Sequence, residues 1–468
     1  MRYVSTRGRA PELGFEDVLL TGLARDGGLY VPAAWPALAP AQMERLAGLP
    51  YANAAAEVMR PFVGDALSDG ELRDLLTAAY ASFRHPAVAP LVQVGPNDWI
   101  LELFHGPTLA FKDVAMQALA RFMDRALERR GGAVTIVTAT SGDTGGAAVE
   151  AFRGRRSIDV FVLYPHGRIS DVQRRQMTTA PEENVHAIAI EGTFDDCQNL
   201  LKALFNDLAL RDRLRLAGVN SINWARLMAQ IVYYFTAGVA LGAPHRPVSF
   251  AVPTGNFGDV FAGYAAMRMG LPVQRLVVAT NVNDILARTV ATGKYQPREV
   301  VATVSPSMDI QISSNFERLL FELAARDAGR VRELMGQLNA EKYFALNQGE
   351  LASLRGSFSA ARTDEAETLA TIHRMHEATG YLADPHTAVG IAAAGKVERN
   401  PAIPMVTLAT AHPAKFPEAV ARAVGAPAPE PEQIARQRGL DERLTVLPND
   451  FAAVSAFITE RARARRPT

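Results

Sequence analysis

Short, continuously apolar segments alternate with amphipathic segments along the middle of the chain, and this pattern restricts the fold more than any other feature. The apolar segments, rich in Val and Ile, are Thr135–Ala139, Ile158–Tyr164, Val185–Ile190, Phe250–Pro253, Leu276–Ala279 and Ile403–Ala409. A strand without polar alternation is buried on both faces, which is typical of a parallel sheet covered by helices on each side. We therefore predict an α/β fold with open, mostly parallel sheets.

A chain of 468 residues is long enough for two or three domains. The pattern of apolar, charged and proline residues changes at four places along it. Residues 316–380 are charged and helical in pattern, and a proline-rich segment begins at Ala426. The predicted units are a mainly helical N-terminal domain at 1–90, an α/β core of two subdomains at 91–315 and 381–425, a helical insertion at 316–380 and a C-terminal extension at 426–468.

Composition excludes several classes of protein. The 49 basic residues balance 49 acidic ones, so the chain lacks the basic surplus that nucleic-acid binding requires. The longest apolar stretch, Ile231–Ala243, is shorter than the roughly 20 residues of a membrane helix and predicts a buried helix instead. The single cysteine, Cys197, excludes a disulfide framework and fits a reducing cytosol. His373 and His376 lie one helical turn apart without an evident third ligand, so we expect no metal site.

Three strand ends are unusually polar and rich in small residues. They are Thr140-Ser-Gly-Asp-Thr-Gly-Gly146, Thr254-Gly-Asn-Phe-Gly-Asp259 and Thr410-Ala-His-Pro-Ala-Lys415. Ligands of parallel sheets bind at the carboxyl ends of strands, and glycine followed by a helix start forms a cradle for anions. The first two segments, which begin at Thr140 and Thr254, lack the glycine spacing of a P-loop or of a dinucleotide-binding motif. This disfavours a nucleotide-dependent dehydrogenase.

Lys112 stands at a predicted helix start, between Phe111 and Asp113. A cation there opposes the helix dipole, so the residue is either a surface lysine or one held for its chemistry. An apolar environment would lower its pKa and let its amine act as nucleophile, imine former or proton carrier. A lysine, a glycine loop for a phosphate and a hydroxyl-rich loop for a carboxylate are the parts of a pyridoxal phosphate enzyme.

The motifs that carry these residues strongly resemble threonine synthase, in the longer branch found in microbes and fungi. They are His105-Gly-Pro-Thr-Leu-Ala-Phe-Lys-Asp113, Ser141-Gly-Asp-Thr-Gly145, Asn220-Ser-Ile-Asn223, Gly255-Asn-Phe-Gly-Asp259 and Thr410-Ala-His-Pro-Ala-Lys-Phe416. The resemblance runs in the family's order from about residue 3 to about residue 425. It implies fold type II of the pyridoxal phosphate enzymes and the conversion of O-phospho-L-homoserine and water to L-threonine and phosphate.

The resemblance also implies roles for individual residues. Lys112 would carry pyridoxal 5'-phosphate as an internal aldimine, Thr410 would meet the pyridine nitrogen, and Asp143 would lie near the cofactor's 3-hydroxyl. The loop that would hold the cofactor phosphate comprises Gly255, Asn256, Phe257, Gly258 and Asp259.

The substrate would be held by two further groups of residues. Ser141, Gly142 and Thr144 match the positions that bind the α-carboxylate, and Asn220, Ser221 and Arg226 match those that bind the substrate phosphate. Without the resemblance, Arg226 would be read as a salt-bridged surface residue. The partners are thus a small-molecule substrate, without nucleic acid or membrane, and we expect a monomer or weak homodimer in the cytoplasm.

Two alternatives stay open at this point. One is another fold type II lyase, such as a serine or threonine dehydratase. The other is a catalytically silent threonine-synthase-like protein that binds a ligand without turnover. The functions of His105, His386 and His412, which lie in or beside these motifs, are not assigned by the sequence, and packing is the expected role for His386 and His412.

Overall fold

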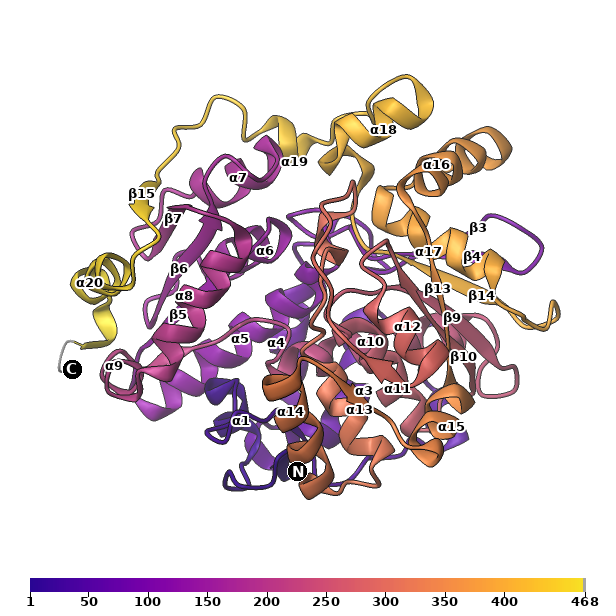
Figure 1. The fold of residues 1–468 in the computed structure, drawn as a ribbon, viewed down its shortest axis with the longest axis horizontal. Coiled ribbons are helices and arrows are strands. Elements are labelled where there is room, and N and C mark those ends of the chain that lie inside the picture. The colour runs from indigo at the N-terminus through magenta and orange to yellow at the C-terminus, as the bar shows by residue number, and fades with distance from the viewer. Residues whose placement is uncertain (466–468) are drawn as a thin grey trace.

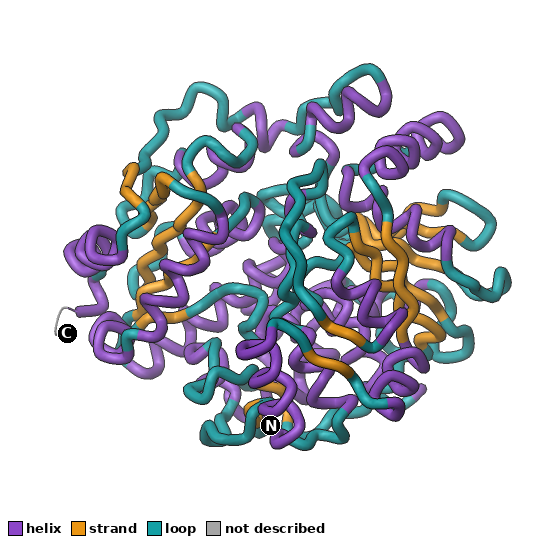
Figure 2. The backbone as a smooth tube through the Cα atoms, in the orientation of Figure 1, coloured by secondary structure: helices purple, strands orange, loops and turns teal. Residues whose placement is uncertain are grey.

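The computed structural model describes residues 1–465, which form two open sheets on opposite sides of a helical centre (Figures 1 and 2). The larger sheet has the order β13-β10-β9-β14-β4-β3, and all its neighbouring strands are parallel except β3 and β4. Its strands are β3 (Leu91–Gln93), β4 (Asp98–Glu102), β9 (Val248–Pro253), β10 (Val273–Thr280), β13 (Phe358–Arg362) and β14 (Met405–Ala409).

The smaller sheet has the order β15-β7-β6-β5-β8 and is parallel throughout. Its strands are β5 (Val134–Ala139), β6 (Ile158–Pro165), β7 (Val185–Glu191), β8 (Leu216–Ala217) and β15 (Thr445–Pro448). Every residue of β5, β6, β9 and β14 is buried. The apolar segments therefore became central strands, and the predicted α/β fold with two parallel sheets is confirmed.

Helices cover both sheets and join them. Those around the smaller sheet are α6 (Asp143–Phe152), α7 (Asp171–Thr178), α8 (Phe194–Asn206), α9 (Leu208–Leu214) and α20 (Phe451–Arg461). Those on the larger sheet are α11 (Gly258–Arg268), α12 (Ile285–Thr292), α15 (Gln348–Ser357) and α17 (Pro385–Lys396). The two central helices, α5 (Lys112–Arg130) and α10 (Trp224–Ala240), pack against each other and connect α6 with α11.

The remaining elements surround this core. At the N-terminal end are β1 (Tyr3–Ser5), β2 (Tyr30–Pro32), α1 (Phe15–Thr21), α2 (Pro40–Glu44), α3 (Tyr51–Val63) and α4 (Asp69–Tyr80). The others are β11 (Lys294–Tyr295), β12 (Phe344–Ala345), α13 (Phe316–Leu323), α14 (Ala328–Glu341), α16 (Glu365–Thr379), α18 (Pro417–Val424) and α19 (Glu432–Ala435). Short 3-10 turns are η1 (Gly64–Ala66), η2 (Pro306–Met308), η3 (Pro413–Lys415) and η4 (Arg463–Arg465).

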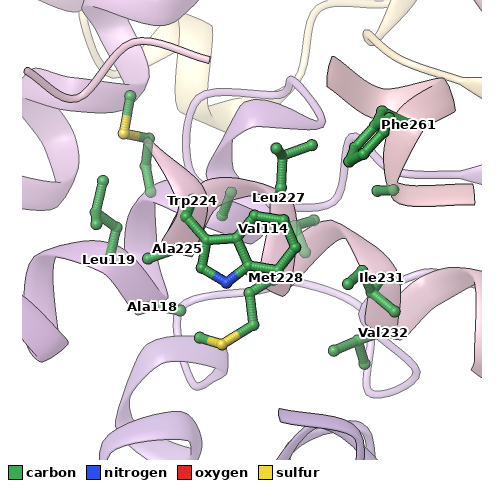
Figure 3. Packing of buried hydrophobic residues seen from close by; sticks show 14 of the residues in the cluster. Val114, Ala118, Leu119, Trp224, Ala225, Leu227, Met228, Ile231, Val232 and Phe261 are labelled. Atoms are coloured by element: carbon green, nitrogen blue, oxygen red, sulfur yellow. The ribbon is translucent and has the colours of Figure 1, made fainter. Parts of the chain in front are cut away.

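A large apolar core holds the central helices to the N-terminal segment. Trp224, at the start of α10, is fully buried, and its ring centroid lies 5.6 Å from that of Phe62 and 5.9 Å from that of Tyr3. Figure 3 shows Val114 and Ala118 of α5 among the apolar side chains around it. The stretch 231–243, expected to be a buried helix, forms most of the second half of α10. Within residues 1–465, no helix combines the length and apolarity that crossing a membrane requires.

Two edge strands differ from the predicted organisation. The segment 316–380 is not only a helical insertion, because its strand β13 pairs in parallel with β10. The segment 426–468 likewise contributes β15, which pairs with β7. Both strands are partly exposed. Strand β13 has no β-branched residue, and β15 is only four residues long and ends in proline, so neither carries the buried apolar run by which central strands are recognised. The division of the chain into four units stays a prediction.

Helix α20 closes one face of the smaller sheet. Its residues Val454 and Ile458 are fully buried in a cluster with Cys197 of α8, which is a core residue as expected. Burial raises the pKa of the Cys197 thiol to about 12, so the thiol is protonated at neutral pH. The C-terminal segment is therefore part of the packed core of this sheet.

We predict that Ile458→Ala lowers the free energy of unfolding by about 2–5 kcal/mol, because it leaves a cavity in this cluster. Urea denaturation measures the change. Val446→Ala, at a residue of β15 that is 41% exposed, is the matched control and should change it by less than about 0.5 kcal/mol. Equal effects of the two substitutions would mean that α20 is not packed as described.

Candidate active site

One cavity of about 1070 Å³ collects nearly all the residues singled out in the sequence. It lies where the carboxyl ends of strands from both sheets meet α5, α10 and the loop that contains η2. The predicted residues that line it are Lys112, Ser141, Asp143, Thr144, Asn220, Ser221, Arg226, Gly255, Asn256, Phe257, Gly258, Asp259 and Thr410. Gly142 is not among the lining residues.

Lys112 is the first residue of α5 and is almost completely buried. Its Nζ lies 4.8 Å from the centroid of the Phe111 ring and 3.5 Å from Oδ2 of Asp143. Burial lowers the pKa of Lys112, and the nearby cations Lys415 and Arg226 act in the same direction, against the attraction of Asp143. The amine is therefore poised to lose its proton, as a nucleophile or base requires.

Asp143 is the buried carboxylate at the centre of the site. Its Oδ1 lies 2.7 Å from Nζ of Lys415 and accepts a 3.0 Å hydrogen bond from Nε2 of Gln173. Burial alone would raise the pKa of Asp143, but the cations of Lys415 and Lys112 outweigh it and hold the pKa well below its usual range. The sequence argument gave no role to Lys415 or Gln173, although Lys415 stands in the quoted Thr410–Phe416 segment.

The loop before α6 is shaped by its own side chains. Oγ1 of Thr140 accepts hydrogen bonds from the N–H groups of Gly142 and Gly145, at 2.9 and 3.0 Å. Gly142 has φ of +138°, and a Cβ there would come within 2.3 Å of the Gln173 side chain. Only glycine fits this position. Ser141 and Thr144 of this turn line the cavity, whereas Gly142 does not.

The segment Gly255–Asp259 forms a cradle at the start of α11. A Cβ on Gly255 would approach the carbonyl oxygen of Ser307 to 2.7 Å, and Phe257 adopts a left-handed φ of +64° just before the helix begins. The N–H groups of the first turn of α11 lack partners inside the helix, and the helix dipole favours an anion there. This is the geometry of a phosphate site.

The carboxylate of Asp259 turns away from this cradle. Its Oδ1 accepts hydrogen bonds from the hydroxyls of Tyr233 and Tyr234 on α10, at 2.5 and 2.9 Å, while Oδ2 has no hydrogen-bond partner among residues 1–465. Burial raises the pKa of Asp259 to about 6, and the two tyrosine hydrogen bonds oppose this rise. The side chain thus anchors α11 to α10, and its backbone N–H is the group that an anion would use.

A second group of donors lies around Arg226 on α10. Its Nη1 donates a 3.0 Å hydrogen bond to the carbonyl of Val219, but within residues 1–465 its buried Nε has no partner and no carboxylate forms an ion pair with it. Burial lowers the pKa of Arg226 to about 10. Oδ1 of Asn220 accepts a 2.6 Å hydrogen bond from Thr138, which leaves its amide N–H groups as donors. A buried guanidinium beside a cavity is a strong site for an anion.

Thr410 lies at the end of β14 and lines the cavity, and its carbonyl accepts a 2.8 Å hydrogen bond from the N–H of Phe111. His386 also lines the cavity: its Nδ1 is 2.8 Å from Oδ1 of Asp384, and its Nε2 accepts from the N–H of Ser307 at 3.2 Å. His412 and His105 are not among the lining residues. The packing role expected for His386 and His412 stays a prediction.

Three family models match the chain. They are described as threonine synthase N terminus, for residues 2–80, pyridoxal-phosphate dependent enzyme, for residues 85–409, and threonine synthase, C-terminal, for residues 387–458. The second of them spans more than half of the chain and includes Lys112, Asp143, Arg226 and the Gly255–Asp259 cradle.

Similar proteins agree over the whole length. The chain is 51% identical to a threonine synthase of Pseudomonas aeruginosa, over 100% of both chains. A crystal structure of pyridoxal-phosphate-bound threonine synthase from Brucella melitensis is 55% identical, with a TM-score of 0.96 over 99% of this chain and 100% of that one. Yeast threonine synthase is 39% identical, with a TM-score of 0.92 over 98% of each chain. The chain belongs to the threonine synthase family, whose members share fold type II with other pyridoxal-phosphate-dependent enzymes.

Proposed function

We propose that this protein converts O-phospho-L-homoserine and water to L-threonine and phosphate. The observation that carries the proposal is that Arg226, buried and without a carboxylate partner, lines the same cavity as the buried amine of Lys112. The amine of Lys112 can hold the cofactor and act as a base on an amino-acid substrate. The buried cation of Arg226 would be stabilised by an anionic group of the substrate, such as a phosphate that leaves in the reaction. A dehydratase of unphosphorylated serine or threonine would have no use for the second anion site.

The residues of the cavity fit pyridoxal phosphate. The Gly255–Asp259 cradle offers helix N–H groups to its phosphate, Lys112 offers an amine with lowered pKa to its aldehyde, and Thr410 offers a hydroxyl near the end of β14. When bound, the cofactor supplies an electron sink that stabilises negative charge developing on the substrate carbons. Because Thr410 is neutral, the ring nitrogen is not forced to stay protonated.

The substrate would be oriented by its two anionic ends. Ser141, Thr144 and the turn at Gly142 are proposed to bind its carboxylate, while Asn220, Ser221 and Arg226 hold its phosphate. Two fixed ends would place the carbons between them beside Nζ of Lys112, whose neutral amine can take a proton from Cα. After it has passed that proton on, the amine is neutral again and can take a proton from Cβ. Phosphate that stays on Arg226 and Ser221 after leaving would be positioned to accept a proton from the attacking water.

We predict that the purified protein has a visible cofactor absorbance and releases phosphate and threonine together from O-phospho-L-homoserine. Lys112→Ala should lose both the absorbance and at least about 10³-fold of the turnover, because the amine has no substitute in the site. Absorbance spectra and assays of phosphate and threonine measure this, with Lys294→Ala, at an exposed residue, as the control.

Each alternative has its own signature in the same assay. Release of ammonia and 2-oxobutyrate from threonine, or of ammonia and pyruvate from serine, would indicate a dehydratase. A visible absorbance without any product would indicate a silent relative. Full activity of Lys112→Ala would overturn the assignment of this residue.

We predict that Arg226→Gln lowers kcat/KM for the phosphorylated substrate by about 10- to 100-fold, which corresponds to a lost hydrogen bond to a charged group. The variant should also be inhibited more weakly by inorganic phosphate, and should keep the visible cofactor absorbance. Arg422→Gln, which removes a surface ion pair with Glu365, is the matched control. Unchanged phosphate inhibition in Arg226→Gln would place the substrate phosphate elsewhere.

A further inference from the structure

A second lysine, Lys415, lies closer to the Asp143 carboxylate than Lys112 does. It lies in η3, directly after β14, and is fully buried. Its Nζ lies 2.7 Å from Oδ1 of Asp143 and donates a 2.9 Å hydrogen bond to the carbonyl of Thr108, in the loop before Lys112. Lys112 is 3.5 Å from the other oxygen, Oδ2. Lys415 therefore also links the larger sheet, through β14, with α6 of the smaller sheet.

The charged groups near the amine of Lys112 differ in whether an opposite charge already pairs with them. The charged groups that act on it are Asp143 of α6, Lys415 of η3, Arg226 of α10 and Asp259 of α11. Asp143 is the carboxylate that approaches Lys112 within ion-pair distance among the described residues, and its negative charge is already matched by Lys415. With Lys112 neutral, Asp143 and Lys415 form a buried pair without net charge, whereas a charged Lys112 leaves two cations for one anion.

We propose that Lys415 is a positioning residue that keeps Asp143 ionised, fixes it by a short ion pair, and prevents it from holding Lys112 as a cation. The proposal rests on the proposed attachment of the cofactor to Lys112. A neutral amine is the reactive form: its nitrogen bonds to the aldehyde carbon while the carbonyl oxygen leaves as water. Because the charges of Asp143 and Lys415 cancel, the pair as a whole acts on Lys112 nearly as a neutral residue at position 143 would.

This arrangement predicts how three variants rank in the pH at which the nitrogen linking Lys112 to the cofactor loses its proton, and packing effects alone would not produce this ranking. In Lys415→Met, the uncompensated Asp143 stabilises positive charge on the nitrogen that links Lys112 to the cofactor. In Asp143→Asn, the uncompensated Lys415 opposes that charge. In the double variant Asp143→Asn/Lys415→Met both charges are gone, so the nitrogen returns to nearly its original electrostatic environment.

The test is a pH titration of the visible cofactor absorbance of the full-length holoenzyme. Lys415→Met should shift the midpoint upward by about one pH unit or more, Asp143→Asn should shift it downward, and the double variant should lie within about 0.3 unit of the original protein. Lys415→Arg keeps the charge and should stay near the original midpoint. Lys396→Met, which breaks an ion pair with Glu367 at the surface, is the matched control and should change nothing.

The outcomes separate this proposal from the one on which it rests. If Lys112→Ala keeps the visible absorbance, the attachment residue is wrong. If the absorbance requires Lys112 but all midpoints coincide, or the double variant behaves as Lys415→Met does, the role of Lys415 is overturned. If Lys415→Met does not fold, the double variant, which buries no unpaired charge at this place, still gives the decisive comparison with Asp143→Asn.

Discussion

The buried ion pair between Asp143 and Lys415 is the interaction on which the charged side of this site depends. It joins α6 on the smaller sheet to the turn after β14 on the larger one, and Gln173 and Thr108 complete its hydrogen bonds. A buried ionised carboxylate is stabilised by an opposite charge and by hydrogen bonds, so the pair constrains where both sheets place their strand ends. The low pKa of Asp143 follows from that placement, whereas the pKa of Lys112 is lowered first by burial and then by the charge of Lys415.

Anion binding in this neutral chain is a local property. The Gly255–Asp259 cradle uses backbone N–H groups and a helix dipole, which add no formal charge. The proposed second anion site would rely on one buried cation, Arg226, whose position on α10 is secured by the apolar core around Trp224. A balance of 49 basic and 49 acidic residues is therefore compatible with a complex that contains two phosphate groups.

The strands predicted from sequence were those in which most residues are buried. Strands β5, β6, β7, β9, β10 and β14 carry continuous apolar runs, and each was expected within a few residues of its bounds. The edge strands β13 and β15 were not expected, because half-exposed strands need no such run. The site followed the same rule: glycine and hydroxyl motifs at strand ends were found in the sequence, while Gln173, on a helix without a motif, was not.

The sequence by itself determined the α/β class and the glycine- and hydroxyl-rich motifs at the strand ends, because apolar periodicity and glycine-rich turns are local properties of the chain. It left Lys112 as either a surface residue or a reactive amine, and only the family resemblance implied its role. Only the tertiary structure decided which charges meet. It turned the Asp259 carboxylate toward Tyr233 and Tyr234, packed Gly142 against Gln173, and placed Lys415 between Asp143 and Thr108. These contacts join residues far apart in the chain, and their energies depend on distance and burial, which no local pattern encodes.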